Sequence, residues 1–315
     1  MKRNNIVKKL MAEKSTLNDL DVSIREIHSL KSKGYNIRSE NIDGQNYYWI
    51  KTMDLDNHLI ISPRSSELEE IIYAEVSDIH CGCEAHDSEG FEWFLKYCED
   101  HGVKHIHNSG DTTDGTGVYP GQVNYLKYVT EEAQINVFLD VASKFKFDWY
   151  AIDGNHDFSW LKKGAPSPNK LISQQLPNYH YIPGKTQQVV RADLVISGVM
   201  KRMVHPWSNT GRSTYAKSYP GQIYLRNCME NGVQFEIGNR IYHLQLLQYG
   251  HLHYDMAYTS FGVRVTHPLS FQKPNDFTEG MGKVGPRGGR ITKLMVQDGQ
   301  ILDYESKAIY VPDRV

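Results

Sequence analysis

Five short polar segments constrain this 315-residue chain more than any other feature. They are Asp78-Ile79-His80, Gly110-Asp111-Thr112-Thr113-Asp114-Gly115, Gly154-Asn155-His156-Asp157, His205-Pro206 and Gly250-His251-Leu252-His253. The first three follow apolar runs at 71–76, 103–107 and 149–152, which we predict to be strands alternating with helices at 91–101 and 125–145. Loops at the carboxyl ends of strands are where α/β proteins place their chemistry. The pattern therefore predicts an α/β domain in which these loops meet.

The residue types in these segments are those that bind divalent metal ions. Asp, Asn and His suit Mn²⁺, Fe²⁺ or Zn²⁺, and the alternate pairs 78/80 and 251/253 could each direct two donors from one loop toward one centre. A carboxylate can bridge two metals about 3.5–4 Å apart, which activate a bridging water as nucleophile and hold the oxygens of a phosphoester. Glycines at 110, 154 and 250 let the backbone turn tightly enough to bring these side chains inward.

In this order, the five segments resemble the calcineurin-like metallophosphoesterase family over roughly residues 71–310. The resemblance implies a two-sheet β-sandwich flanked by helices. It implies two divalent metal ions, expected to be Mn²⁺, with Fe, Zn, Ni or Mg as alternatives. The implied ligands are Asp78, His80 and His253 at one metal, Asn155, His205 and His251 at the other, and Asp111 between them. A single His-Pro pair is a weak pattern, so His243 and His267 are alternatives to His205.

The resemblance also implies a catalytic role for His156, which would stabilise the transition state or protonate the leaving oxygen, oriented by Asp114. The residue types agree with this role, because a histidine titrates near neutral pH and a carboxylate on its other nitrogen fixes its tautomer. Asp157 is expected to support the ligands rather than bind a metal.

Two departures from the family's Ser/Thr protein phosphatases bear on the substrate. Those enzymes have an arginine soon after the second segment's aspartate and a glutamate after the Asn-His pair. Here Gly115-Thr116 follows Asp114, and Asp157 follows His156, which argues against a protein phosphatase. The region 213–222 looks loosely like metallophosphoesterases of phage and prophage genomes, and Arg212 beside it is a candidate for binding a substrate phosphate.

Residues 1–56 form a separate pattern of helices followed by a hairpin, with a linker predicted over 57–70 and the catalytic domain over 71–315. A capping box at Ser23–Glu26 and a turn at Asp43-Gly44 mark its elements. The order resembles a winged helix-turn-helix with 23–33 as recognition helix and 35–51 as wing. The expected DNA contacts are Arg25, His28, Ser29 and Lys31. A protein-docking or regulatory domain is the alternative.

Charge and composition narrow the function classes. Lys and Arg total 35 against 37 Asp and Glu, so no global field attracts nucleic acid, and any such attraction must be local. Four cysteines, no apolar run of about 20 residues and no signal-peptide pattern predict a cytoplasmic protein without a membrane partner. We expect a phosphoester hydrolase, specifically a phosphodiesterase or nuclease acting on DNA. The alternatives are a phosphatase or phosphodiesterase for a small metabolite with a regulatory N-terminal domain, and a non-catalytic DNA-binding scaffold.

Overall fold

The computed structural model of the chain describes residues 6, 9–10, 14–32, 37–50, 58–184, 189–206, 216–230, 235–237, 240–280 and 285–313. The chain divides into two compact units. One comprises Met1–Asp56 with Gly221–His243, and the other comprises Asn57–Pro220 with Leu244–Val315. Among the described residues, no helix has both the length and the apolar composition to cross a membrane.

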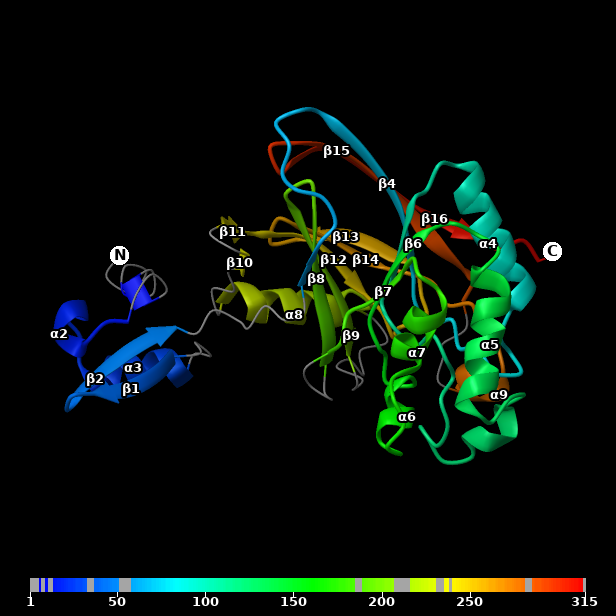
Figure 1. Cartoon of the computed structure of the whole chain (residues 1–315), viewed down its shortest axis with the longest axis horizontal. Helices are drawn as coiled ribbons and strands as arrows, with labels where there is room; N and C mark the ends of the chain where they lie inside the picture. The colour runs from blue at the N-terminus through cyan, green and yellow to red at the C-terminus, as the bar shows by residue number, and fades with distance from the viewer. Residues whose placement is uncertain are drawn as a thin grey trace. The chain divides into compact units, whose positions relative to one another are not determined.

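The larger unit contains two six-stranded sheets (Figure 1). The first, which we call the helix-covered sheet, has the strand order β16-β15-β4-β5-β6-β7. Strands β4 to β7 are parallel, and β15 and β16 extend the sheet in antiparallel fashion. Its strands are β4 (Glu69–Val76), β5 (His105–Asn108), β6 (Asp148–Ala151), β7 (Tyr179–Tyr181), β15 (Gly288–Gln297) and β16 (Gln300–Tyr310).

The second sheet has the order β13-β14-β12-β9-β8-β3. Its central strands β9, β12 and β14 are parallel, whereas β8 and β13 run antiparallel to β9 and β14. Its strands are β3 (His58–Ile60), β8 (Val189–Ile196), β9 (Val199–Pro206), β12 (Leu244–Tyr249), β13 (Met256–Ser260) and β14 (Val263–His267).

Helices lie between the parallel strands of the first sheet and cover one of its faces (Figure 1). They are α4 (Ser88–Asp100), η1 (Gln122–Tyr125), α5 (Glu131–Ala142), α6 (Phe158–Leu161) and α7 (Pro168–Gln175), and the short α9 (Asp276–Gly280) follows β14. The longer helices begin at polar N-cap residues. The side chains of Asp87, Thr130 and Ser167 accept hydrogen bonds from backbone amides in the first turns of α4, α5 and α7.

Successive side chains of β4 point to opposite faces of the sheet, and the two faces pack against different neighbours. Ala74 and Val76 pack with Phe91 and Phe138 of the covering helices, whereas Ile71 and Tyr73 pack with residues of the second sheet. A strand buried on both faces needs a nearly continuous apolar run, and the sequence at 71–76 is apolar except for Glu75. The predicted α/β fold, a two-sheet sandwich flanked by helices, is confirmed.

The range 57–70, predicted to be a linker, includes β3 and the first residues of β4. Residues 58–60 pair with 193–195 of β8. This segment joins the sheet because the apolar side chains of Leu59 and Ile61 pack against the core between the sheets. In the sequence, the polar and turn-forming residues around them hide this apolar pattern.

The smaller unit has α2 (Leu17–Leu20), α3 (Ile24–Ser32) and a hairpin of β1 (Ile37–Ile42) and β2 (Gln45–Ile50). The capping box is present at α3: Ser23 N donates to Glu26 Oε2 over 2.8 Å, and Glu26 N faces Ser23 Oγ at 3.4 Å. The 221–243 segment carries β10 (Phe235–Ile237), β11 (Arg240–Tyr242) and most of α8 (Tyr219–Glu230). Much of the first predicted helix lies outside the described residues, so the winged-helix interpretation stays a prediction.

Candidate metal centre

The five predicted segments lie at one edge of the sandwich. Loops after β4, β5 and β6 of the helix-covered sheet meet the end of β9 and the loop after β12 from the second sheet. Two hydrogen bonds join the contributions: His251 N donates to Asp78 Oδ2 over 2.9 Å, and His205 Nδ1 donates to the carbonyl of Ser109 over 2.7 Å. The site therefore forms only where both sheets are in place.

Asp78, His80 and His253 form a first group whose potential ligand atoms lie within 4.8 Å of one another. The Nε2 atoms of His80 and His253 are 3.1 Å apart, and His253 Nε2 lies 3.1 Å from Asp78 Oδ1. Asp78 Oδ1 is buried, and no backbone amide or hydroxyl of the described residues donates to it. An acceptor oxygen and two ring nitrogens that converge in this way fit a divalent cation.

Asp111, His205 and His251 form a second group with the same spacing. His205 gives its Nδ1 proton to the Ser109 carbonyl, so in the neutral ring Nε2 is an acceptor. That nitrogen faces two further oxygens at 3.1 Å, Asp111 Oδ2 and Asn155 Oδ1. Three acceptors at this distance repel one another unless a proton or a cation lies between them, so these residues also fit a metal.

The electrostatics of the metal-free centre follow from this crowding. Burial alone would lower the pKa of His205, but the neighbouring Asp111 carboxylate raises it to about 9. Burial would raise the pKa of Asp78, but the charges of His253, His205 and His80 hold it well below its usual range. A proton held at His205 occupies the place that a cation would take.

The backbone is strained at these positions. Five of the seven predicted ligands have left-handed φ angles: Asp78 (54°), His80 (55°), Asp111 (55°), His251 (77°) and His253 (57°). Such conformations cost non-glycine residues about 1–3 kcal/mol each and cluster at functional sites. The strain lowers the stability of the folded state, and in return these loops hold the donor atoms close together.

Asp114 and His156 lie beside the first group, and with His80 they form a third cluster of potential ligands. The sequence predicts that the Asp114 carboxylate orients His156, and the structure corrects this in detail. Asp114 Oδ1 lies 2.9 Å from Nδ1 of His80, whereas Nδ1 of His156 donates to the Asp114 main-chain carbonyl over 2.7 Å. The carboxylate is 3.5 Å from His156, because the shorter approach is taken by His80.

Asp157 is fully buried and acts through the backbone. Its carboxylate accepts hydrogen bonds from the amides of Thr112, Thr113 and Gly154 over 2.8–3.1 Å. Burial raises its pKa to about 7, with the charges of Asp111 and Asp153 adding to the effect. It ties the loop after β5 to the loop after β6, which fits the predicted supporting role.

The alternatives to His205 lie elsewhere in the chain. His267 is buried with Tyr249, Tyr254 and Tyr258 around its ring, and His243 is exposed within 221–243. Neither belongs to a potential ligand group of the described residues. Arg212 lies outside the described residues.

The expected DNA contacts are only partly visible. On α3, Arg25, His28 and Ser29 are exposed, while the side chain of Lys31 lies outside the described part. Sequence reasoning did not single out Ser109, whose carbonyl orients His205. Its place directly before Gly110 in the second segment is the signal that could have found it.

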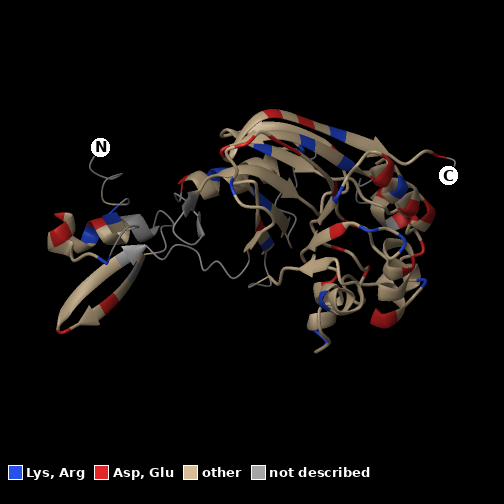
Figure 2. Ribbon diagram, turned by 45° about the horizontal axis from the view of Figure 1, so that its top comes forward, with Lys and Arg blue, Asp and Glu red and all other residues tan. Residues whose placement is uncertain are grey.

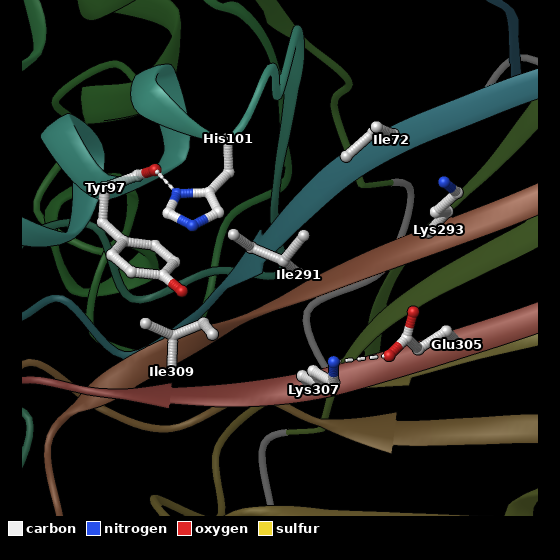
Figure 3. Close-up of a pocket in the computed structure, with 8 residues that line it drawn as sticks. All are labelled: Ile72, Tyr97, His101, Ile291, Lys293, Glu305, Lys307 and Ile309. Carbon is white, nitrogen blue, oxygen red and sulfur yellow. Dashed lines mark hydrogen bonds and ion pairs between the residues drawn. The ribbon is translucent and has the colours of Figure 1, made fainter.

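A separate surface groove of about 320 Å³ lies between α4 and strands β4, β15 and β16 (Figure 3). Isoleucines form part of its floor, and its charged residues are engaged locally: Lys307 Nζ lies 2.6 Å from Glu305, and Lys293 Nζ pairs with Glu70. Acidic and basic residues are interspersed along α4 and these strands (Figure 2). None of the ligand groups among the described residues lies there.

Comparisons with known proteins add two curated relatives, and no family model matches the chain. A DNA polymerase II small subunit from Thermoplasma acidophilum is 22% identical over 268 residues, which are 78% of this chain and 52% of the relative. Its counterpart from Methanothermobacter thermautotrophicus is 31% identical over 121 residues, 33% of this chain and 25% of that protein. The chain spans about half the length of the first relative and a quarter of the second.

Solved structures with similar folds include an archaeal phosphodiesterase, at a TM-score of 0.41 and 14% identity, covering 76% of this chain and 100% of that one. Vacuolar protein sorting 29 from Cryptosporidium parvum matches with a TM-score of 0.38 and 9% identity, covering 76% and 98%. The two large mixed sheets, the covering helices and the five loops at one edge confirm the predicted architecture, a two-sheet α/β sandwich flanked by helices.

Proposed function

We propose that this protein is a metal-dependent phosphodiesterase that acts on DNA. One observation carries the proposal: two groups of carboxylate and imidazole ligands, one with Asp78 and the other with Asp111, lie where the two sheets meet and are linked by the hydrogen bond from His251 N to Asp78. We propose Mn²⁺ as the metal, because mixed oxygen and imidazole donors suit it.

The bound metals would supply an activated water and hold the oxygens of the phosphoester. The chain's own residues would position the substrate and supply the proton to its leaving oxygen. Because a carbonyl oxygen can only accept, the Nδ1 position of His156 carries a proton and Nε2 is the atom that exchanges one. Burial lowers the pKa of His156, although Asp111 and Asp114 oppose it, and the charge of a bound phosphodiester would raise it again. We propose that Nε2 protonates the leaving oxygen.

Two observations support DNA as the substrate. Both curated relatives bear the name DNA polymerase II small subunit. Helix α3 also exposes Arg25, His28 and Ser29, three of the positions expected to contact DNA. It belongs to residues 1–56, which contain ten Lys and Arg against eight Asp and Glu.

The test compares four substrates with Mn²⁺: bis(p-nitrophenyl) phosphate, p-nitrophenyl phosphate, and labelled single- and double-stranded DNA. We expect turnover of the chromogenic diester and of DNA, abolished by EDTA and by Asp111→Ala. Turnover of the small substrates alone would favour the metabolite enzyme with a regulatory N-terminal domain. DNA binding without any turnover would favour the non-catalytic scaffold.

A further inference from the structure

Gln122, at the start of η1, is buried beneath the centre and bonds one residue twice. Its Nε2 donates to the Asp114 main-chain carbonyl over 2.7 Å and lies 2.9 Å from the Asp114 carboxylate oxygen Oδ2. Its Oε1 accepts from Val118 N over 2.8 Å. Since the amide oxygen is committed to an N–H donor, the NH₂ group must face Asp114. The side chain is 1% exposed, so water does not substitute for these bonds.

Asp114 in turn holds two histidines with two different oxygens. Its Oδ1 lies 2.9 Å from Nδ1 of His80, a predicted ligand, and its carbonyl accepts from Nδ1 of His156, the predicted proton donor. Gln122 therefore bonds Oδ2, the carboxylate oxygen of Asp114 that does not contact His80. It also donates to the same main-chain carbonyl of Asp114 that accepts from His156. A displacement of Asp114 that moves both its carboxylate and its carbonyl would disturb both rings together.

We infer that Gln122 is a positioning residue of the metal centre, in addition to anchoring its loop. The inference rests on the proposed function and names a part of its machinery. Gln122 holds Asp114 in the orientation that sets the ring of His80 toward the metal and the ring of His156 toward the leaving group. Partners one step removed from metal ligands typically change metal affinity or activity by about 10–100-fold when they are replaced.

The chain offers a matched control. Gln134 is also fully buried and pins the same loop, because its Oε1 accepts from Gly115 N over 2.9 Å and its Nε2 donates to the carbonyls of Gly115 and Tyr128 over 3.1 and 2.8 Å. Its bonds go to the main chain of the loop, including the amide of the Asp114–Gly115 peptide, and none of them reaches the Asp114 carboxylate that holds His80. If Gln122 serves only to anchor the loop, the two glutamines should behave alike.

The experiment compares Gln122→Glu, Gln122→Met and Gln134→Met in the full chain. Gln122→Met removes both bonds to Asp114, whereas Gln122→Glu keeps an acceptor for Val118 and places a second carboxyl group against the Asp114 carboxylate, so a loss shared by the two variants follows from the contact with Asp114. Mn²⁺ affinity is measured by calorimetry, hydrolysis is measured on aryl diesters with leaving groups of different pKa, and stability is measured by thermal melting.

For both Gln122 variants we expect Mn²⁺ affinity to fall by about 10–100-fold. The loss of kcat should grow as the leaving group becomes poorer, because His156 is misplaced. Gln134→Met should lower the melting temperature without a fall in Mn²⁺ affinity, because it leaves the contact between Gln122 and the Asp114 carboxylate in place. Wild-type Mn²⁺ affinity in Gln122→Met, or an equal loss of affinity in Gln134→Met, would overturn the inference. If the wild-type chain hydrolyses no diester, the proposed function fails, while the Mn²⁺ affinities still decide the role of Gln122.

Discussion

Gly154→Ala tests whether the close approach of two loops positions Asp111, the carboxylate expected to bridge two metals. Gly154 follows β6, and a Cβ built there would lie 2.0 Å from Asp111 Oδ1 and 2.4 Å from Asp111 N. The backbone of Gly154 is outside the left-handed region, so alanine could adopt its conformation. Any effect must therefore come from the contact, not from the glycine's conformational freedom.

The magnitude follows from these distances. Ordinary Cβ contacts lie at 3.4–4 Å, and the amide nitrogen of Asp111 belongs to the backbone, so a side-chain rotation cannot relieve the overlap. The loops after β5 and β6 must separate by about 1 Å, a displacement that can cost about 10²-fold in rate when it moves a reacting group. Overpacking of this kind typically lowers the free energy of unfolding by about 1–3 kcal/mol.

Three measurements check this prediction: kcat on a small diester, Mn²⁺ affinity by calorimetry, and the melting temperature. Gly154→Ala should lose about 100-fold in kcat and bind Mn²⁺ more weakly. Gly280→Ala is the control, because a Cβ at Gly280 meets no atom of the described residues within 4 Å. If Gly154→Ala keeps wild-type metal affinity and rate, the approach of these loops does not position Asp111, and the reasoning fails.

Four further predictions follow from the structure. His156→Ala should keep both metals but lower kcat by about 10²–10⁴-fold; loss of metal by elemental analysis would make His156 a ligand instead. In the metal-free protein, His205 has a pKa of about 9 against a usual 6.5, so the native state binds more protons between these values. Its free energy of unfolding should therefore fall as pH rises through this window, and calorimetry in different buffers should show proton release on Mn²⁺ binding at pH 8. Lys201→Met should cost about 3–5 kcal/mol in chemical denaturation by leaving Glu75 buried without its cation, and adding Glu75→Gln should recover part of the loss. Arg25→Ala should weaken DNA binding and reduce the log–log salt slope by about 0.9 without changing diester turnover; an unchanged slope would remove α3 from the DNA site.

The sequence predicted the alternation of strands and helices because each buried strand is a short apolar run followed by a polar loop. It missed the break in the helix predicted over 125–145. The structure has η1 at Gln122–Tyr125 and α5 at Glu131–Ala142 instead. The signal was present: Thr130 caps α5 with its side chain, and two glutamates follow it.

For the site, residue types and spacing indicated metal-binding segments, because few side chains bind divalent metals, and the resemblance to the calcineurin-like metallophosphoesterases supplied the individual ligands. They could not distinguish the two oxygens of Asp114 that hold different histidines, since that depends on the direction of the chain after β5. The left-handed backbone of the ligand loops was equally inaccessible, because Asp and His adopt this conformation more often than most residues but too rarely to predict it at a given position.

The two halves of the centre come from different sheets, so the distances between ligands depend on how the sheets pack. Buried polar contacts fix that packing close to the site. Lys201 of the second sheet lies 2.6 Å from Glu75 of β4 and is fully buried. Gln248 of β12 donates to the carbonyls of Val76 and His107, at the ends of the strands that precede the ligand loops. Apolar packing alone would tolerate small slips between the sheets, whereas these directional bonds do not. We therefore expect the metal centre and the sandwich core to behave as one cooperative unit, so that variants of this polar layer alter metal affinity without touching a ligand.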